Sequence, residues 1–349
     1  MKLIKTKFGE TRDKEEVYIY KLLGKNIEVE VLNYGCIIKS IFTPDQNGNF
    51  KNIVASFNDF ESYENCPMFI GCITGRVAGR IKKGILKIKE DIYQLETNEG
   101  KNHLHGGRNS LNRKVWKVFN IEEKQDLIKI TFNYVSPHLE NNYPGKIDLY
   151  VTYILSNDTL KIEYLGFPDR ETYISLTNHT FFNLTGDCSQ QILNHKIKVM
   201  TDKVIEIDNE KLPIKIEDIN KTNFDLKNFI SFRKLLSIED IQLEYAGNGL
   251  DHSFILNESE KIKCICQERE SGRYVAVETD QPVVVVYTGN SIRENIVFYD
   301  NIKAIKHFGF CLETQDYPDI QNIHKESMKL YNKNNPYIQN TTFRFGTIR

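Results

Sequence analysis

The chain has 349 residues, of which 40% are hydrophobic and 27% charged, so it has enough apolar material for a large core and too much for a disordered protein. Its 46 lysine and arginine residues are balanced by 47 aspartate and glutamate residues, which excludes the basic excess typical of proteins that bind nucleic acids or anionic membranes. The seven cysteines are odd in number and scattered, and no apolar stretch follows the basic residues near Met1, so we expect a globular protein of the reducing cytoplasm.

Strand patterns dominate the chain from its first third onward. Short alternating runs of apolar residues, separated by Gly, Asn, Asp and Pro clusters, occur at residues 27–32, 37–42, 128–134 and 274–287. The clearest pattern is the alternation over residues 146–155, which resumes at Leu160 after the turn cluster at residues 156–159. This pattern predicts a β-hairpin.

Helical periodicity is weak in this sequence. The best helix candidate, residues 230–243, falls within the polar, lysine-rich stretch at residues 203–249, which we interpret as an excursion from the sheets. No Gly/Ser-rich or Pro-rich linker and no repeat divides the chain, so we predict a single domain over residues 1–349. The many short strands predict an all-β fold, either a sandwich or a barrel, and the length favours a large two-sheet β-sandwich.

Two segments in the first third combine polar side chains with apolar, strand-like surroundings. In residues 71–81, Arg76 and Arg80 lie among glycines, and each either pairs with a structural carboxylate or donates hydrogen bonds to sugar hydroxyls. In residues 102–107, His103 and His105 share one face if the segment is extended. Two imidazoles on one face raise a metal hypothesis, but no third ligand follows at metal-site spacing, so we expect contacts with a polar ligand and no metal.

Polar groups also concentrate in the second half of the chain. His179 lies among amide, hydroxyl and aromatic residues, where it is either structural or a titrating group beside a pyranose ring. Asp251 begins an apolar strand and is either a turn cap or a ligand contact, and Gln281 is either a turn residue or a ligand contact. Glu313 ends an apolar strand, and a buried glutamate is usually either an ion-pair member or a base.

Taken in order, seven segments resemble the aldose 1-epimerase (galactose mutarotase) family: residues 75–81, 102–107, 143–145, 178–184, 251–256, 287–290 and 313–318. The resemblance implies a single large β-sandwich with an open cleft for a monosaccharide, and no metal, nucleotide or flavin cofactor. His179 matches the general acid of the family and Glu313 its general base. Positions that hold the sugar hydroxyls are matched by Arg80, His105, Asp251 and Gln281.

Two positions depart from the pattern of the family. Gly79 stands where many members have asparagine, and Phe181 stands where many have tyrosine. Each change removes a hydrogen-bonding group near the sugar, so the choice among hexoses stays open.

The implied reaction is the interconversion of the α and β anomers of a free hexose such as glucose or galactose. It needs a base that removes the anomeric hydroxyl proton and an acid that protonates the ring oxygen. Unperturbed pKa values of about 4.3 for glutamate and about 6.5 for histidine predict an ionised Glu313 and a partly protonated His179 near neutral pH. The expected partner is a monosaccharide, and the chain is expected to be a monomer or a homodimer.

Three other functions remain open at this point. A hexose 6-phosphate 1-epimerase would have cations at the far end of the cleft, and a sugar-binding module would keep only the hydrogen-bonding and aromatic residues. A glycoside hydrolase would need two carboxyl groups about 5–9.5 Å apart, for which Asp251 and Glu313 are the candidates.

Overall fold

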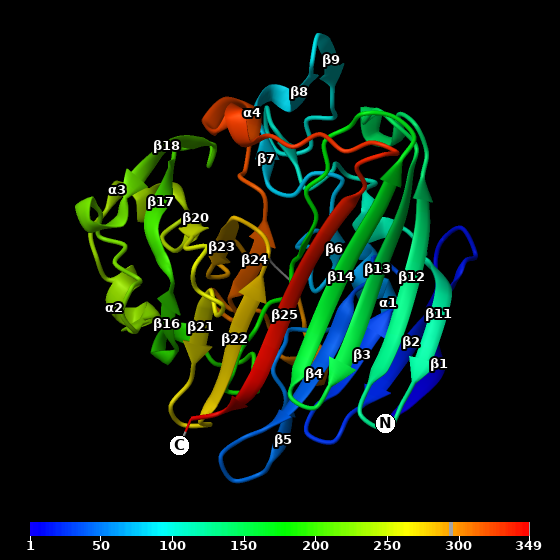
Figure 1. Cartoon of the computed structure of the whole chain (residues 1–349). Helices are drawn as coiled ribbons and strands as arrows, with labels where there is room; N and C mark the ends of the chain where they lie inside the picture. The colour runs from blue at the N-terminus through cyan, green and yellow to red at the C-terminus, as the bar shows by residue number, and fades with distance from the viewer. Residues whose placement is uncertain (293–295, 349) are drawn as a thin grey trace.

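The computed structural model describes residues 1–292 and 296–348. Its regular secondary structure is mostly antiparallel strands, which form one nine-stranded sheet, two five-stranded sheets and three short strand pairs (Figure 1). The nine-stranded sheet has the strand order β11 (Lys117–Glu123), β12 (Ile128–Ser136), β13 (Ile147–Ser156), β14 (Thr159–Pro168), β25 (Tyr337–Thr347), β22 (Arg273–Thr279), β21 (Cys264–Gln267), β16 (Lys196–Val199) and β19 (Ile230–Ser231).

The two five-stranded sheets have different topologies. The first is a meander in chain order, made of β1 (Lys2–Glu10), β2 (Glu16–Leu23), β3 (Glu28–Leu32), β4 (Ile38–Pro44) and β5 (Phe50–Asn52). The second gathers distant parts of the chain in the order β18 (Pro213–Asp218), β17 (Thr201–Ile207), β20 (Asp251–Leu256), β23 (Val283–Tyr287) and β24 (Cys311–Gln315). We call this second sheet the cleft sheet.

Short elements complete the fold. The strand pairs are β7 (Arg80–Ile81) with β10 (His103–Leu104), β6 (Ile73–Thr74) with β15 (Thr177–Asn178), and β8 (Ile85–Ile88) with β9 (Asp91–Gln94). The α-helices are single turns: α1 (Phe60–Asn65), α2 (Phe232–Leu236), α3 (Ile241–Tyr245) and α4 (Ile320–Ile323). No helix in residues 1–292 and 296–348 is long and apolar enough to cross a membrane.

The core lies between the nine-stranded sheet and the two five-stranded sheets. One cluster of buried side chains draws on all three sheets, with members such as Leu22, Val29, Phe132, Val151, Val286 and Leu312. In β13 every second side chain from Ile147 to Leu155 is fully buried, because side chains of a strand alternate between its two faces. Each such buried aliphatic side chain stabilises the fold by about 1.5–3 kcal/mol. The predicted all-β sandwich is confirmed.

The predicted hairpin is also confirmed, since β13 and β14 pair from Ile147 with Pro168 to Ser156 with Thr159. The interpretation of residues 203–249 as an excursion from the sheets is wrong in its first third. Strands β17 and β18 belong to the cleft sheet, and their exposed lysines hid the alternation, because one face of these strands is solvated. The helix expected at residues 230–243 is interrupted, with only the single turns α2 and α3 formed.

Candidate active site

A cleft of about 1080 Å³, including solvent at its mouth, lies over the cleft sheet. Its sheet wall is formed by alternate residues of four strands, which point to the same face: Ile205, Ile207, Asp251, Ser253, Val285, Tyr287, Glu313 and Gln315. Strand register places Ser253, Val285 and Glu313 in one row across three strands. Its loop wall, on the other side, comes from short segments that carry Phe69, Gly79, Arg80, His105, His179 and Phe181.

The structure brings His179 and Glu313 together at the bottom of this cleft. His179 follows β15, where its backbone N–H donates to the carbonyl of Cys72 at 2.8 Å and its carbonyl accepts from Gly71 N–H at 3.0 Å. The Nε2 atom of His179 lies 3.5 Å from Oε1 of Glu313, and both side chains are less than 10% exposed. On the other side of the ring, Nδ1 lies 3.6 Å from Sγ of Cys311. An acid and a base are therefore adjacent, although 134 residues separate them in the sequence.

Burial controls the protonation of this pair. It lowers the pKa of His179 to about 4, opposed by the hydrogen bond to its own backbone and by the charge of Asp251. Burial, and next the charge of Asp251, raise the pKa of Glu313 well above its ordinary value, while the nearby Arg80 guanidinium lowers it. Both shifts favour the uncharged form of the group concerned, neutral imidazole for His179 and carboxylic acid for Glu313. The expectation of an ionised Glu313 rests on an unperturbed pKa, and desolvation shifts the pKa of this carboxyl group in the opposing direction.

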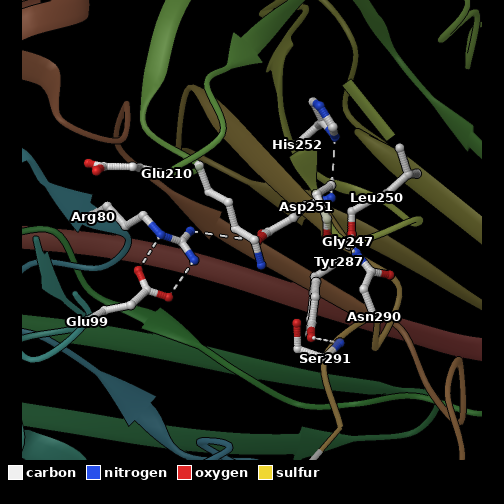
Figure 2. Close-up of polar contacts among 12 residues, drawn as sticks. Arg80, Glu99, Glu210, Gly247, Leu250, Asp251, His252, Tyr287, Asn290 and Ser291 are labelled. Atoms are coloured by element: carbon white, nitrogen blue, oxygen red, sulfur yellow. Dashed lines mark hydrogen bonds and ion pairs between the residues drawn. The ribbon is translucent and has the colours of Figure 1, made fainter. Parts of the chain in front are cut away.

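Arg80 is fixed between two carboxylates, as Figure 2 shows. Its Nε and Nη2 atoms donate to the Glu99 carboxylate at 2.6 and 2.9 Å. Its Nη1 atom lies 3.6 Å from Oδ2 of Asp251. By contrast, Arg76 is buried away from the cleft and donates to backbone carbonyls, including Gly145 at 2.7 Å. Of the two arginines that the sequence singled out, Arg80 lines the cleft and Arg76 is structural.

The two histidines of residues 102–107, His103 and His105, also separate. His103 is held between the carbonyl of Glu96 and the hydroxyl of Tyr143, each at 2.6 Å, and is not part of the cleft. His105 lines the cleft because its left-handed backbone, with φ of 49°, turns the side chain away from that of His103. The shared face that an extended segment would give is therefore not formed. Nδ1 of His105 accepts the Gly79 N–H at 3.2 Å, which leaves the Nε2–H as a donor.

Asp251 lies between two cationic side chains, those of Arg80 and Lys211. Its Oδ2 atom lies between Nη1 of Arg80 at 3.6 Å and Nζ of Lys211 at 3.8 Å. Gln281, in contrast, is not brought to the cleft. It lies in the turn between β22 and β23, and its side chain donates to Asp280 at 2.9 Å on the surface. The residue of β23 that lines the cleft beside Glu313 is Val285. The assignment of Gln281 to the sugar site is corrected accordingly.

Both departures noted in the sequence lie at the cleft. Gly79 has a positive φ of 76°, and a side chain added there would meet Gln315 and Pro318. Phe181 stacks on Phe308 at a centroid distance of 5.0 Å and also lies 5.0 Å from the His179 ring. This side of the cleft is consequently apolar. Aromatic faces beside an acid–base pair suit the C–H faces of a pyranose.

Three ligand-type side chains meet in the cleft, namely His105, His179 and Glu313, with one ligand atom from each within 4.8 Å of the others. Sequence spacing did not predict this cluster. A metal ion fits it poorly, because the Arg80 guanidinium is close enough to lower the pKa of both His105 and Glu313. The same positive charge opposes a bound cation.

Several cleft residues escaped the sequence analysis, including Phe69, Glu99, Lys211, Val285 and Gln315. The turn before Pro213 was the only local signal for Lys211, whose backbone has a positive φ of 61°. Glu99 and Phe69 gave none, since each reaches the cleft from a loop.

Comparison with known proteins agrees with this geometry. The sequence model of the aldose 1-epimerase family matches residues 19–344. A galactose mutarotase of Bos taurus is 32% identical over 331 residues, covering 94% of this chain and 93% of the bovine one. An aldose 1-epimerase of Haemophilus influenzae is 30% identical over 292 residues, covering 82% and 83% of the two chains.

The solved structures give the same result. The galactose 1-epimerase of Lactobacillus acidophilus superposes with a TM-score of 0.88 at 25% identity, covering 100% of this chain and 99% of that one. A GalM/aldose epimerase homologue from C. elegans superposes with a TM-score of 0.85, at 22% identity. The chain described here belongs to the aldose 1-epimerase family, a family of isomerases.

Proposed function

We propose that this protein interconverts the α and β anomers of free hexoses such as galactose and glucose, with Glu313 as general base and His179 as general acid. The observation that carries the proposal is the contact between Nε2 of His179 and Oε1 of Glu313, 3.5 Å apart and buried at the bottom of a cleft. Mutarotation needs one proton acceptor and one proton donor close to the anomeric centre. This pair supplies both.

The proton inventory of the pair fits the reaction. The mechanism needs one proton on the pair, and burial favours Glu313 as its site because it raises the pKa of Glu313 and lowers that of His179. When a sugar binds, transfer of this proton to His179 gives a carboxylate and an imidazolium. The carboxylate then removes the anomeric hydroxyl proton while the imidazolium protonates the ring oxygen, and the bond between the anomeric carbon and the ring oxygen breaks.

The ring-opened aldehyde thus faces a protonated Glu313 and a neutral His179. Burial favours these protonation states, since it raises the pKa of Glu313 and lowers that of His179. Rotation about the bond between the first two carbons presents the other face of the carbonyl. Reversal of both proton transfers then closes the ring to the other anomer.

The remaining polar groups support hydroxyl binding. Arg80 can donate from its Nη1 atom, which faces Asp251, and His105 can donate from its Nε2–H. The carboxylate of Asp251 can accept hydrogen bonds. Phe181 and Tyr287 add aromatic faces near the His179 ring. We assign the positioning of the hydroxyls to Arg80, His105 and Asp251.

The charge balance of the cleft favours an unphosphorylated sugar. Its two described cations, Arg80 and Lys211, are neutralised by Glu99 and Asp251. A phosphate group would need uncompensated cations. A glycoside hydrolase is disfavoured because the chain belongs to a family of epimerases.

A cytoplasmic location is part of the proposal. Cys36, Cys72, Cys188, Cys264, Cys266 and Cys311 all carry free thiols, which suits a reducing compartment. Whether the enzyme works as a monomer or a homodimer is testable by light scattering, and we expect one of these two states.

Polarimetry tests the proposed reaction directly. Freshly dissolved α-anomers of galactose, glucose, xylose and glucose 6-phosphate are followed with and without enzyme. We expect faster relaxation of optical rotation for the free hexoses and little acceleration for glucose 6-phosphate. No acceleration for any free sugar would contradict the proposal, and preference for glucose 6-phosphate would favour the phosphosugar alternative.

A further inference from the structure

The tip of the β17–β18 hairpin, residues 208–212, reaches the cleft through Lys211. Asp208 fixes this turn, because its carboxylate accepts the backbone N–H groups of Glu210 at 2.9 Å and Leu212 at 3.0 Å. The side chain of Asn102 donates to Glu210 at 3.1 Å, which ties the hairpin to the segment that carries His105. Figure 2 shows Glu210 on the same side of Asp251 as Arg80. The turn is thereby held in place, and Lys211 lines the cleft.

The contacts of Asp251 are too long for direct hydrogen bonds. Oδ2 of Asp251 is 3.8 Å from Nζ of Lys211 and 3.6 Å from Nη1 of Arg80. Charged N–H···O bonds are about 2.7–2.9 Å long, so neither cation uses its facing hydrogen on the carboxylate. An oxygen atom beside the line that joins the cation to Oδ2 can be about 2.8 Å from both, where it would accept from the cation and donate to the carboxylate. A hydroxyl group has this combination of donor and acceptor.

We infer that Lys211 is a substrate-binding residue, and that Lys211, Asp251 and Arg80 together bind two neighbouring hydroxyl groups of the sugar. One hydroxyl occupies the gap between Lys211 and Asp251, and the other occupies the gap between Asp251 and Arg80. Both contacts share the Oδ2 atom, which suits two hydroxyls on adjacent carbons. This inference rests on the proposed function and specifies which sugars the site prefers, namely those with an intact vicinal diol away from the anomeric carbon.

The test compares Lys211→Met with the wild-type enzyme. Methionine keeps the length of the stem and removes the three N–H donors. We expect KM for galactose or glucose to rise about tenfold or more, as for the loss of one hydrogen bond from a charged donor, while kcat stays within about twofold. The matched control is Lys215→Met, since Lys215 is on the same hairpin but pairs with Glu217 outside the cleft. It should leave both constants unchanged.

A set of singly deoxygenated hexoses separates direct binding from disturbance of Asp251. If Lys211 holds one hydroxyl, the sugar lacking that hydroxyl binds wild-type enzyme weakly, and Lys211→Met weakens its binding no further. An equal rise in KM for every sugar would overturn the inference, because it would indicate a displaced Asp251. Unchanged KM for galactose and glucose in Lys211→Met would overturn it as well. Loss of the proposed function itself would be recognised separately, by the absence of mutarotation in the wild-type enzyme.

Discussion

The two walls of the cleft are built by different physical means. In the sheet wall, Asp251 and Glu313 belong to paired strands, and the register of these strands determines which side chains face the cleft. The loop wall takes His105 and His179 from segments with only two-residue strands. It depends on single backbone positions such as Gly106, where an added Cβ would lie 1.9 Å from the carbonyl oxygen of Gly75. The sheet wall should therefore tolerate substitution of its backbone neighbours, whereas the loop wall should not.

The largest expected effect comes from removing one catalytic group from each wall. We expect Glu313→Gln and His179→Asn each to lower kcat about 10²–10⁴-fold, or roughly 3–5 kcal/mol in the barrier, with much smaller changes in sugar affinity. The double variant should be scarcely worse than the poorer single one, because both residues act in one ring-opening event. Polarimetry gives kcat, and calorimetry gives affinity.

Circular dichroism is the control that each of these variants is folded. A folded variant with near-normal turnover would remove that residue from the mechanism. Strictly additive losses would mean that the two walls contribute to separate steps.

A change of one methyl group should break the loop wall. Gly106→Ala forces a left-handed residue with φ of 87° against the Gly75 carbonyl, so we expect a loss of roughly 2–4 kcal/mol of stability and a large fall in kcat/KM. Gly100→Ala is the matched control, since Gly100 has φ of 57° but nothing within 4 Å of an added Cβ. Thermal unfolding and polarimetry measure both effects. Equal behaviour of the two variants would show that the loop wall is not rigid.

Acid should destabilise both walls through their buried histidines. Burial lowers the pKa to about 4 for His179 in the loop wall, for His103 outside the cleft and for His252 on the face of the cleft sheet that points away from the cleft. The unfolded chain, with a histidine pKa of about 6.5, takes up protons first as the pH falls. The free energy of unfolding should thus decrease from about pH 6.5 to about pH 4, by up to about 3 kcal/mol for each histidine.

Urea denaturation at a series of pH values measures this dependence. Between pH 7 and 8 these histidines are neutral in both states and should contribute no slope. A free energy of unfolding that stays constant down to pH 4.5 would contradict the burial of these rings as neutral groups.

The smallest expected effect is that of chelation. The three ligand-type groups that meet across the two walls, His105, His179 and Glu313, are assigned to proton transfer and hydroxyl binding. Prolonged dialysis against a chelator should leave the mutarotation rate unchanged. A large loss that added Zn²⁺ restores would reassign the cluster as a metal centre.

The same contrast explains how much the sequence could predict. The hairpin of β13 and β14 and the placement of Glu313 at the end of a buried strand follow from the period of two, which any strand imposes on its side chains. His105 needed a positive φ at a residue other than glycine, and Gln281 needed the knowledge that the strand starts only after Pro282. Neither feature has a periodic signal.

Electrostatics were the other limit of the sequence analysis. The residue types at positions 179 and 313 indicated an acid and a base, but their pKa values depend on burial and on Asp251, which is 62 residues from Glu313 in the chain. The pairing of His179 with Glu313 came from the resemblance to the family and not from their spacing in the sequence. That residues 1–349 form one domain stays a prediction.

Strand β25 has a consequence for how the protein is made. It lies between β14 and β22 and pairs with both, so it joins the two halves of the nine-stranded sheet. Residues 337–347 leave the ribosome long after β14, and until then the edges of β14 and β22 present unpaired backbone groups to other chains. Completion of the nine-stranded sheet must therefore wait until residues 337–347 have been synthesised, and up to that point β14 and β22 are edge strands open to pairing with other chains.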